Sequence, residues 1–353
     1  MSVLSRHLSR LFLGRWLAAL LALSVLLQML DLLDNATAVL TRGGGALGVL
    51  HYAALRLPSA AERLVPLAAL LAALLTFARL AAGSEAATLR ALGVGGPGMV
   101  RALLPACVLV AGLQFVLTDQ VVPRTQRAFA DWWAALPKAD PPSDNDRLWL
   151  RLGDDILAVR RVEERGTRLS GVLLVRRDAE GEAVARLDAA GAAFRPQGWE
   201  LRDVRVASLD GSLPRQVAAM PWPEGPRPRN LAELALPIES VPLEQILRVL
   251  DGRWVGNRGE GFYRTRLQER LAALPSAAIM LLLAFPATLA LPRRGGAGRW
   301  AALSLLLGLG YVALGGGLAA LGEAGVLMPA LAAWTAPVAF GCAGLVLLLH
   351  LEG

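Results

Sequence analysis

The sequence contains little of the chemistry on which soluble enzymes depend. Lysine occurs once, as Lys138, in the context Pro-Lys-Ala. A Walker A loop requires Gly-Lys-Ser/Thr, so the chain by itself is not a P-loop ATPase, and a Schiff-base lysine is nearly excluded. The three histidines and two cysteines are far apart and lie beside or within apolar runs, so neither a metal-ligand spacing nor a disulfide framework is present. A Gly-x-Ser-x-Gly nucleophile motif is absent as well.

Charge is scarce and unevenly distributed. Only 18% of the 353 residues are charged and 55% are hydrophobic, whereas soluble proteins carry about 25% charged residues. Residues 122–270 hold 22 of the 29 acidic and 24 of the 36 basic residues. This distribution indicates a polar insert between two apolar segments. The arginine clusters flank apolar runs, so we interpret the net charge of +7 as a topology signal and not as a nucleic-acid surface.

Six apolar runs are long enough to span a bilayer, which takes about 20 residues. They cover residues 16–33, 64–80, 102–118, 271–292, 300–322 and 324–349. Arginines gather near the N-terminus, between runs two and three, and between runs four and five. The positive-inside rule therefore places both termini and these two segments in the cytoplasm, and the insert on the opposite side. Three arginines in the expected loop between the first two runs do not follow this rule: Arg42, Arg56 and Arg63.

A cleaved signal peptide is the competing interpretation of the N-terminus. Arg6 to Arg15 would form its charged region, and Ala36-Thr37-Ala38 resembles a cleavage site. The apolar run is longer than that of a usual signal peptide, and polar residues beginning at Asp31 separate it from the site. An uncleaved first span is therefore favoured.

The polar insert has the pattern of β-strands. Short alternating segments separated by glycine-containing turns occur at 149–152, 156–159, 171–177, 183–188, 192–195 and 200–207. This pattern predicts an antiparallel sandwich or jellyroll. Next come an expected linker at 221–228, a short helix at 242–250 and an amphipathic helix at 262–270.

The predicted fold class is membrane α-helical, with six transmembrane helices (three plus three) and an inserted periplasmic antiparallel β-jellyroll. The expected domains are residues 1–121, 122–270 and 271–353. The acidic residues Asp31, Asp34 and Asp119 lie near the ends of spans, where we expect solvated caps and not an acid–base pair.

Residues 83–94, between the second and third runs, are the most informative segment. Ser84 can cap a helix that starts with Glu85, and Gly93 can end it. Leu89 and Leu92 would lie on one side of that helix. The residues alone leave two interpretations open: a surface helix that joins two spans, or a lever inserted into a partner protein.

At this point the sequence resembles a known family. Pro66–Leu74 leading to Gly83-Ser84-Glu85, followed by Leu89–Gly93, is similar to the LptF/LptG-type (YjgP/YjgQ) permeases that export lipopolysaccharide. Val122-Pro123 after the third run and Tyr263–Pro275 before the fourth also fit this family. The resemblance covers nearly the whole chain, and the N-terminus and length are closer to the LptG-type branch.

The resemblance implies a permease subunit of an ABC transporter in the Gram-negative inner membrane. Such a transporter extracts lipopolysaccharide and passes it to a periplasmic bridge toward the outer membrane. The implied partners are a sister LptF-type permease, a cytoplasmic LptB-type ATPase dimer that binds ATP and magnesium, a bitopic LptC-type protein and an LptA-type bridge. This chain would be neither an enzyme nor the holder of a cofactor. The implied ATPase-coupling residues are Ser84, Glu85, Leu89, Arg90, Leu92 and Gly93.

Guanidinium groups near the outer surface would bind lipid phosphates. Members of the family often carry a basic residue in the outer half of the first span, where this chain has Gln28 and Asp31. The candidate substrate-binding residues are Gln28, Asp31, Arg42, Arg63, Arg124 and Arg127. Each of the arginines could equally be an ordinary solvated charge.

The fifth run contains five glycines. They are Gly308, Gly310, Gly315, Gly316 and Gly317. Small residues let helices approach closely, so these glycines indicate either a packing seam or a moving lateral gate.

Two other functions stay open at this stage. One is a membrane-anchored scaffold or sensor whose β-domain binds a protein without moving lipid. The other is an ion-coupled transporter, which is disfavoured because the spans lack buried carboxylates and clear internal repeats.

Overall fold

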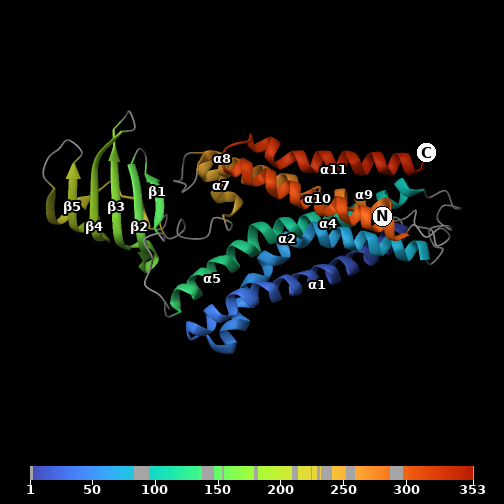
Figure 1. The fold of residues 1–353 in the computed structure, drawn as a ribbon, viewed down its shortest axis with the longest axis horizontal. Helices are drawn as coiled ribbons and strands as arrows, with labels where there is room; N and C mark the ends of the chain where they lie inside the picture. Colours follow the sequence, from blue (N-terminus) through green and yellow to red (C-terminus); the bar gives the residue numbers. More distant parts are fainter. Residues whose placement is uncertain are drawn as a thin grey trace. The chain divides into compact units, whose positions relative to one another are not determined.

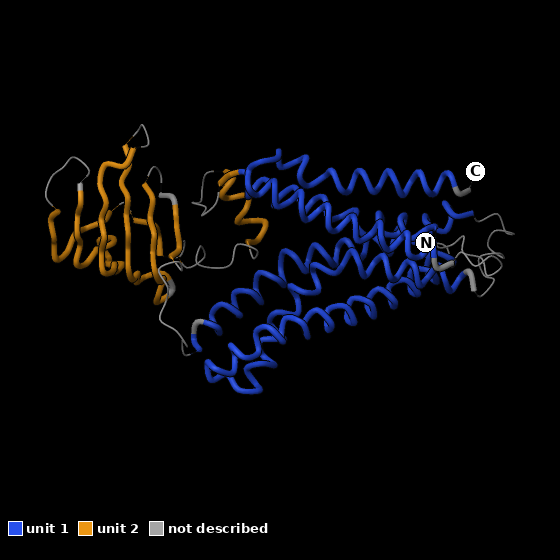
Figure 2. The backbone as a smooth tube through the Cα atoms, in the orientation of Figure 1, with its two compact units in different colours: residues 1–136, 261–353 blue, residues 137–260 orange. Residues whose placement is uncertain are grey.

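The computed structural model describes residues 3–82, 95–136, 147–152, 155–178, 182–208, 214–223, 225–228, 231, 241–251, 259–286 and 297–352. The chain forms two compact units: residues 1–136 together with 261–353, and residues 137–260 (Figure 2). The expected boundaries at 122 and 270 do not coincide with these units. Residues 122–136 and 261–270 belong to the first unit, because they continue the helices next to them.

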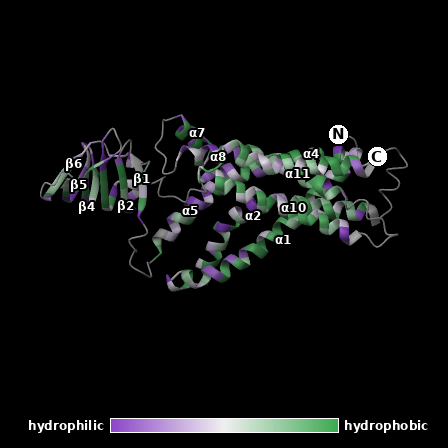
Figure 3. Cartoon of the chain, turned by 45° about the horizontal axis from the view of Figure 1, so that its top comes forward, coloured by the Kyte–Doolittle hydropathy of each residue, from purple (hydrophilic) through white to green (hydrophobic). Residues whose placement is uncertain are grey.

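The first unit is a helical bundle built from both ends of the chain (Figure 1). Its helices are α1 (Val3–Thr41), α2 (Gly45–Ala82), α4 (Gly96–Val116), α5 (Val122–Ala135), α8 (Glu260–Ala273), α9 (Ser276–Ala284), α10 (Ala297–Glu323) and α11 (Pro329–Glu352). A π-helical turn, η1 (Leu117–Val121), joins α4 to α5. The long helices are hydrophobic over most of their length (Figure 3).

Five described helices are long and apolar enough to cross a membrane. They are Leu4–Thr41, Gly45–Leu80, Gly96–Trp133, Arg299–Glu323 and Pro329–His350. The pair α8 and α9, bent by 49°, provides a sixth if it is one span. Pro275 lies at this bend, where a proline can neither donate a backbone hydrogen bond nor fit an uninterrupted helix. The predicted membrane-helical fold class with an inserted β-domain is confirmed.

The first two helices are much longer than the apolar runs that predicted them. α1 has 39 residues and α2 has 38. At 1.5 Å per residue each is about 57 Å long, well beyond the hydrocarbon thickness of about 30 Å. The expected loop between them shrinks to Arg42–Gly44, with Gly43 in the left-handed region at φ +78°. The placement of Arg56 and Arg63 in a loop was therefore wrong, because both lie on α2.

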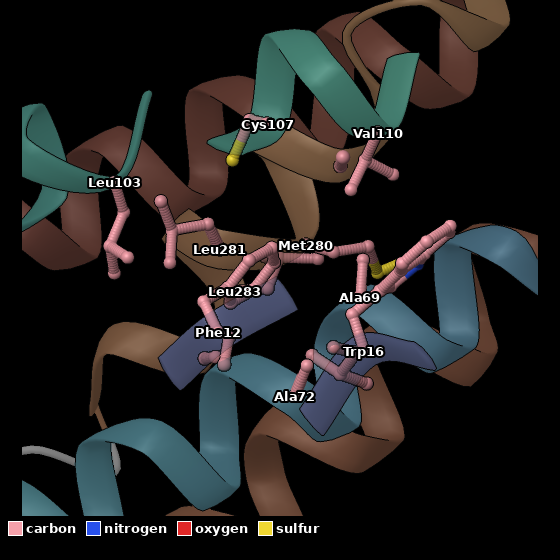
Figure 4. Close-up of a cluster of buried hydrophobic side chains, with 14 of the residues drawn as sticks. Phe12, Trp16, Ala69, Ala72, Leu103, Cys107, Val110, Met280, Leu281 and Leu283 are labelled. Atoms are coloured by element: carbon pink, nitrogen blue, oxygen red, sulfur yellow. The ribbon is translucent and has the colours of Figure 1, made fainter. Parts of the chain in front are cut away.

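The core of the bundle brings together α1, α2, α4 and α9 (Figure 4). Phe12 and Trp16 of α1 pack with the small residues Ala69 and Ala72 of α2. α9 is buried on almost every side, since Ile279, Met280, Leu281, Leu283 and Ala284 are all core residues. On the outside, large apolar side chains such as those of Leu306 and Val346 are more than 60% exposed, as expected for lipid-facing helices.

The second unit is built on one antiparallel sheet whose strands pair in chain order. The strands are β1 (Leu148–Leu152), β2 (Asp155–Glu163), β3 (Arg168–Arg177), β4 (Ala183–Arg195), β5 (Gly198–Ser208) and β6 (Arg215–Trp222). The predicted antiparallel β-insert is confirmed, and so is a short helix after it, α7 (Leu243–Leu250). The described strands form one sheet, whereas the expected sandwich or jellyroll has two. β6 was not predicted, and β4 is one strand where two were expected.

A row of irregular positions crosses this sheet. On each of the strands β2 to β5, one residue is skipped by the strand pairing, although its neighbours on both sides are paired. These residues are Arg160, Gly171, Ala190 and Asp203. Buried residues are therefore three positions apart across the row and not two, as in Leu169 and Val172, or Leu201 and Val204. Gly171 at φ +62° and Asp203 at φ +51° have left-handed backbones. The residues skipped on neighbouring strands lie opposite one another, so the pairing register is the same on both sides of the row. We call this feature the irregular row.

Candidate functional site

The buried face of α1 changes from apolar to polar along the helix. Every fourth residue is buried, first Leu8, Phe12, Trp16 and Leu20, and then Ser24 and Gln28. The Ser24 Oγ and Gln28 Nε2 atoms are buried and find no hydrogen-bond partner among the described residues. An unsatisfied buried polar group costs about 1–3 kcal/mol. This polar seam is therefore a position where a water or a polar ligand group would be stabilised.

Asp31, close to the polar seam, joins α1 to α2. The Tyr52 hydroxyl donates a 2.8 Å hydrogen bond to Asp31 Oδ2. Arg56 Nη2 lies 3.6 Å from Asp31 Oδ1, in a pair whose side chains are 38% and 27% exposed. These contacts give Asp31 a role in fixing the helix hairpin, in addition to any role as a substrate ligand.

An aromatic cluster lies where the α1–α2 hairpin meets α5. It consists of His51, Tyr52, Phe129, Trp132 and Trp133. The rings of Phe129 and Trp133 stack at 5.6 Å, and the Tyr52 ring meets Phe129 edge-on at 5.5 Å. Tryptophan and tyrosine are enriched at membrane–water interfaces. The cluster therefore favours an interfacial position for this end of the bundle.

Two arginines lie over rings of the aromatic cluster. Arg42 Cζ is 4.4 Å from the centre of the Trp133 ring, and Arg56 Cζ is 5.5 Å from that of Phe129. Cation–π contacts of this kind orient a guanidinium, and the Arg56 guanidinium also faces the Asp31 carboxylate. Of the predicted substrate residues, the structure thus places Arg42 on the aromatic cluster, together with Arg56, which the sequence did not indicate as a substrate residue.

Arg124 and Arg127 lie on α5, three residues apart and hence on neighbouring positions of one face. Arg124 is exposed, and its Nη2 donates a 2.9 Å hydrogen bond to Gln120 Oε1. Arg127 is half-buried, and its Nε finds no acceptor among the described residues. Arg63 is exposed on α2.

A buried ion pair connects the first three spans to the last three. Arg270 Nη1 of α8 donates to Asp119 Oδ1 of η1 at 2.6 Å, and the side chains are only 11% and 14% exposed. Nearby, the buried Ser276 hydroxyl donates to Gln114 Oε1 at 3.2 Å. The expectation of a solvated cap at Asp119 was therefore wrong, because α8 folds against the π turn and covers it.

The glycines of α10 fall into two groups. A Cβ at Gly308 would lie 2.3 Å from Leu70 Cδ2 of α2, so these helices meet at that glycine. Gly310 and Gly315 make ordinary contacts with α11, through Phe340 and Ala336. At Gly316 and Gly317 a Cβ would meet no described atom within 4 Å.

We expect Gly308→Leu to lower the free energy of unfolding by about 1–3 kcal/mol, because the added side chain overpacks a tight contact. Gly316→Leu is the matched control on the same helix. It should be neutral or slightly stabilising, because leucine favours helix over glycine. Unfolding of the purified chain by SDS titration measures both. Equal losses in the two variants would contradict the packing role of Gly308.

The predicted ATPase-coupling residues lie outside the described residues. This applies to Ser84, Glu85, Leu89, Arg90, Leu92 and Gly93. Within the part of the chain that is described, no group of three or more His, Cys, Asp or Glu side chains is placed to hold a metal ion.

Together, the apolar helical bundle, its bent α8–α9 pair and its β-insert define a multi-pass membrane protein with an extramembrane β-domain. Residues 6–350 match the family described as lipopolysaccharide export system permease LptF/LptG. The chain belongs to this family, whose members are permease subunits.

Two curated relatives support this assignment. The chain is 23% identical over 274 residues to the lipopolysaccharide export system permease protein LptG of Escherichia coli K12, covering 75% of this chain and 74% of that protein. It is equally similar to LptG of Escherichia coli O6:H1.

The site residues predicted from the sequence did not include Tyr52, Arg56 or the aromatic residues of α5. The signal was present in the sequence: Phe129 precedes Trp132-Trp133 in a segment that also contains Arg124, Arg127 and Asp131. Aromatic residues on one side of an amphipathic helix next to a span are typical of an interfacial anchor.

Proposed function

We propose that this chain is the transmembrane subunit of an ABC transporter that extracts lipopolysaccharide from the inner membrane and passes it to a periplasmic bridge toward the outer membrane. The observation that carries the proposal is the family match over residues 6–350, which includes both helical halves and the β-insert. ATP hydrolysis then belongs to a separate cytoplasmic subunit that binds ATP and magnesium.

The energetics of extraction explain why such a permease needs a motor. Each buried methylene of an acyl chain contributes about 0.8 kcal/mol, so a glycolipid with several chains leaves the bilayer only when work is done on it. The helices supply an apolar surface for the chains. The polar seam and the arginines near the aromatic cluster supply partners for the head group.

The partner set follows from the same proposal. It comprises a sister LptF-type permease, an LptB-type ATPase dimer, a bitopic LptC-type protein and an LptA-type bridge. We propose residues 84–93 as the coupling helix that contacts the ATPase. The open positions at Gly316 and Gly317 leave part of α10 available for a neighbouring helix.

Co-purification in mild detergent tests the proposal. A tagged version of the chain should retain a P-loop ATPase and a second six-span permease, and ATP turnover of the complex should respond to added lipopolysaccharide. Retention of periplasmic proteins alone, with no ATPase, would instead support a membrane-anchored scaffold.

Replacing both Arg124 and Arg127 with alanine should weaken glycolipid binding by about tenfold or more, since charge-assisted bonds to phosphate are lost. Assembly with the ATPase should be unchanged. Arg101→Ala, which removes an exposed arginine from the start of the same span, is the control. Equal binding by the double variant and the parent in nanodiscs would show that both arginines only anchor the span at the head groups.

A topology experiment tests the proposed orientation. A reporter fused near Gly181 should lie in the periplasm, and one near Gly295 should lie in the cytoplasm, because arginine clusters mark the cytoplasmic segments. Finding both reporters on the same side would contradict the six-span topology.

A further inference from the structure

The polar seam of α1 faces α2. Ser24 and Asp31 are seven residues apart, close to two helical turns, so they lie on the same face of α1. Asp31 contacts α2 through Tyr52 and Arg56. Ser24 therefore faces α2 as well, and Gln28, four residues further on, is its neighbour on that face.

Ser59 of α2 lies opposite the polar seam. It follows Tyr52 by seven residues, so both side chains lie on the face of α2 that meets α1. The two helices form an antiparallel hairpin. The step from Asp31 back to Ser24 and the step from Tyr52 on to Ser59 therefore run in the same direction, and each covers about 10 Å. Ser59 thus lies at the level of Ser24 and Gln28.

Gln126 of α5 adds a third helix to this polar group. Its Nε2 atom donates a 3.0 Å hydrogen bond to Ser59 Oγ, whereas its Oε1 atom is buried and finds no donor among the described residues. Three unsatisfied atoms thus surround Ser59: Ser24 Oγ, Gln28 Nε2 and Gln126 Oε1. They comprise a hydroxyl, a donor and an acceptor. We call Ser24, Gln28, Ser59 and Gln126 the polar site.

Other buried hydroxyls of the bundle are satisfied within their own helices. Thr76 donates to the Ala72 carbonyl at 2.6 Å, and Thr265 donates to the Gly261 carbonyl at 2.8 Å. Bonds of this kind to the preceding turn are common for serine and threonine. The Ser24 hydroxyl makes none within the described part of the chain, so it is oriented toward another partner.

We propose that the polar site binds ordered water inside the helical bundle, at the depth of Ser24 in the first span. Water both donates and accepts, and a buried water typically makes about three hydrogen bonds, so it can satisfy all three atoms. The four side chains are no more than 7% exposed, and the site is therefore too enclosed for a sugar or a phosphate. A lipid head group would bond to the polar seam through this water.

A sodium ion is the competing occupant. Sodium sites in membrane proteins are built from oxygen atoms, whereas one of the unsatisfied atoms here is the Gln28 amide nitrogen, a donor. The nearest carboxylate of the hairpin, Asp31, is already engaged by Tyr52 and Arg56. Water is favoured because it alone pairs with a donor as well as with an acceptor.

Water-edited solid-state NMR of the isotopically labelled full-length chain in lipid bilayers tests the site directly. Magnetisation from water should reach the side chains of Ser24 and Gln28 several-fold faster than that of Leu20. Leu20 is the matched control, because it is buried on the same face one turn before Ser24. Equally slow transfer to all three residues would show that the site is dry and would overturn the proposal.

A stability comparison provides a second test. Ser24→Ala should lower the midpoint of unfolding in an SDS titration, because it removes a hydrogen-bond partner of the water. Ser304 of α10 is also buried without a partner among the described residues, but Leu307 and Gly308 on the next turn offer no second polar side chain. Ser304→Ala should therefore leave the midpoint unchanged or raise it. Equal midpoints for the two variants would contradict a water site at Ser24.

The same titration separates water from sodium. The midpoint of the parent chain should be equal in sodium chloride and in choline chloride at one ionic strength. A rise that depends on sodium would overturn the proposal in favour of a cation site. None of these measurements involves a glycolipid or an ATPase, so their outcome is independent of the proposed export function.

Discussion

Asp119→Leu should lower the free energy of unfolding of the helical bundle by about 3–5 kcal/mol, the cost of removing one partner from a buried ion pair. The Asp119 and Arg270 side chains are 14% and 11% exposed, so the remaining guanidinium stays buried without this carboxylate. SDS titration followed by circular dichroism measures the loss. The effect is large because the pair is buried, and it is also a contact between elements from the two ends of the chain, α8 and η1.

A double variant separates the charge effect from a packing effect. Asp119→Leu/Arg270→Met should recover most of the lost stability, because it removes both desolvated charges together. Glu323→Gln is the control: it disrupts the 2.9 Å Arg266–Glu323 pair, whose side chains are 36% and 27% exposed. This control should cost no more than about 1 kcal/mol. A loss of similar size in the control and in Asp119→Leu would contradict the importance of burial.

Glu85→Lys should reduce transport-coupled ATP turnover by at least about tenfold, because reversing a charge at a protein interface typically costs 2 kcal/mol or more. This prediction rests on the proposed coupling helix, and Glu85 lies outside the described residues. ATP turnover of the reconstituted complex is the measurement, with insertion and folding verified in parallel.

The matched control for this variant reverses an exposed charge elsewhere. Glu182→Lys, in the exposed β3–β4 turn, should leave turnover unchanged, because surface charges contribute little to stability. Unchanged turnover and export in Glu85→Lys would instead favour a helix that only connects two spans.

The spans were predictable because about 20 consecutive apolar residues have few alternative structures. The ends of the helices were not. Hydropathy falls where charges such as Asp31 and Arg56 enter, although the helices continue because those side chains pair with one another across the hairpin. A pattern of hydrophobicity records which residues prefer lipid, and it contains no information about which charges will meet.

The strands illustrate the same limit. The predictions ended β2 at 159, began β3 at 171 and divided β4 between 188 and 192. These errors all fall on the irregular row, where the alternation of buried and exposed residues changes phase. A two-residue period cannot be followed through such a change. The site residues were harder still, since Tyr52 and Phe129 are brought together only by the packing of α2 on α5.

The π turn between α4 and α5 determines which side chains of α5 face the neighbouring helices. A π turn contains one more residue than an α turn, which rotates the next helix by about 100° relative to a continuous one. Val110 and Gln114 are buried before the turn, and Val122 and Gln126 are buried after it. An uninterrupted α-helix with 3.6 residues per turn would bury the equivalent positions of α5 one residue earlier in the sequence. A helical wheel drawn through this span as a single helix would therefore misplace Phe129 and Trp133 by that angle. The extra residue is what aims the aromatic face of α5 at Tyr52.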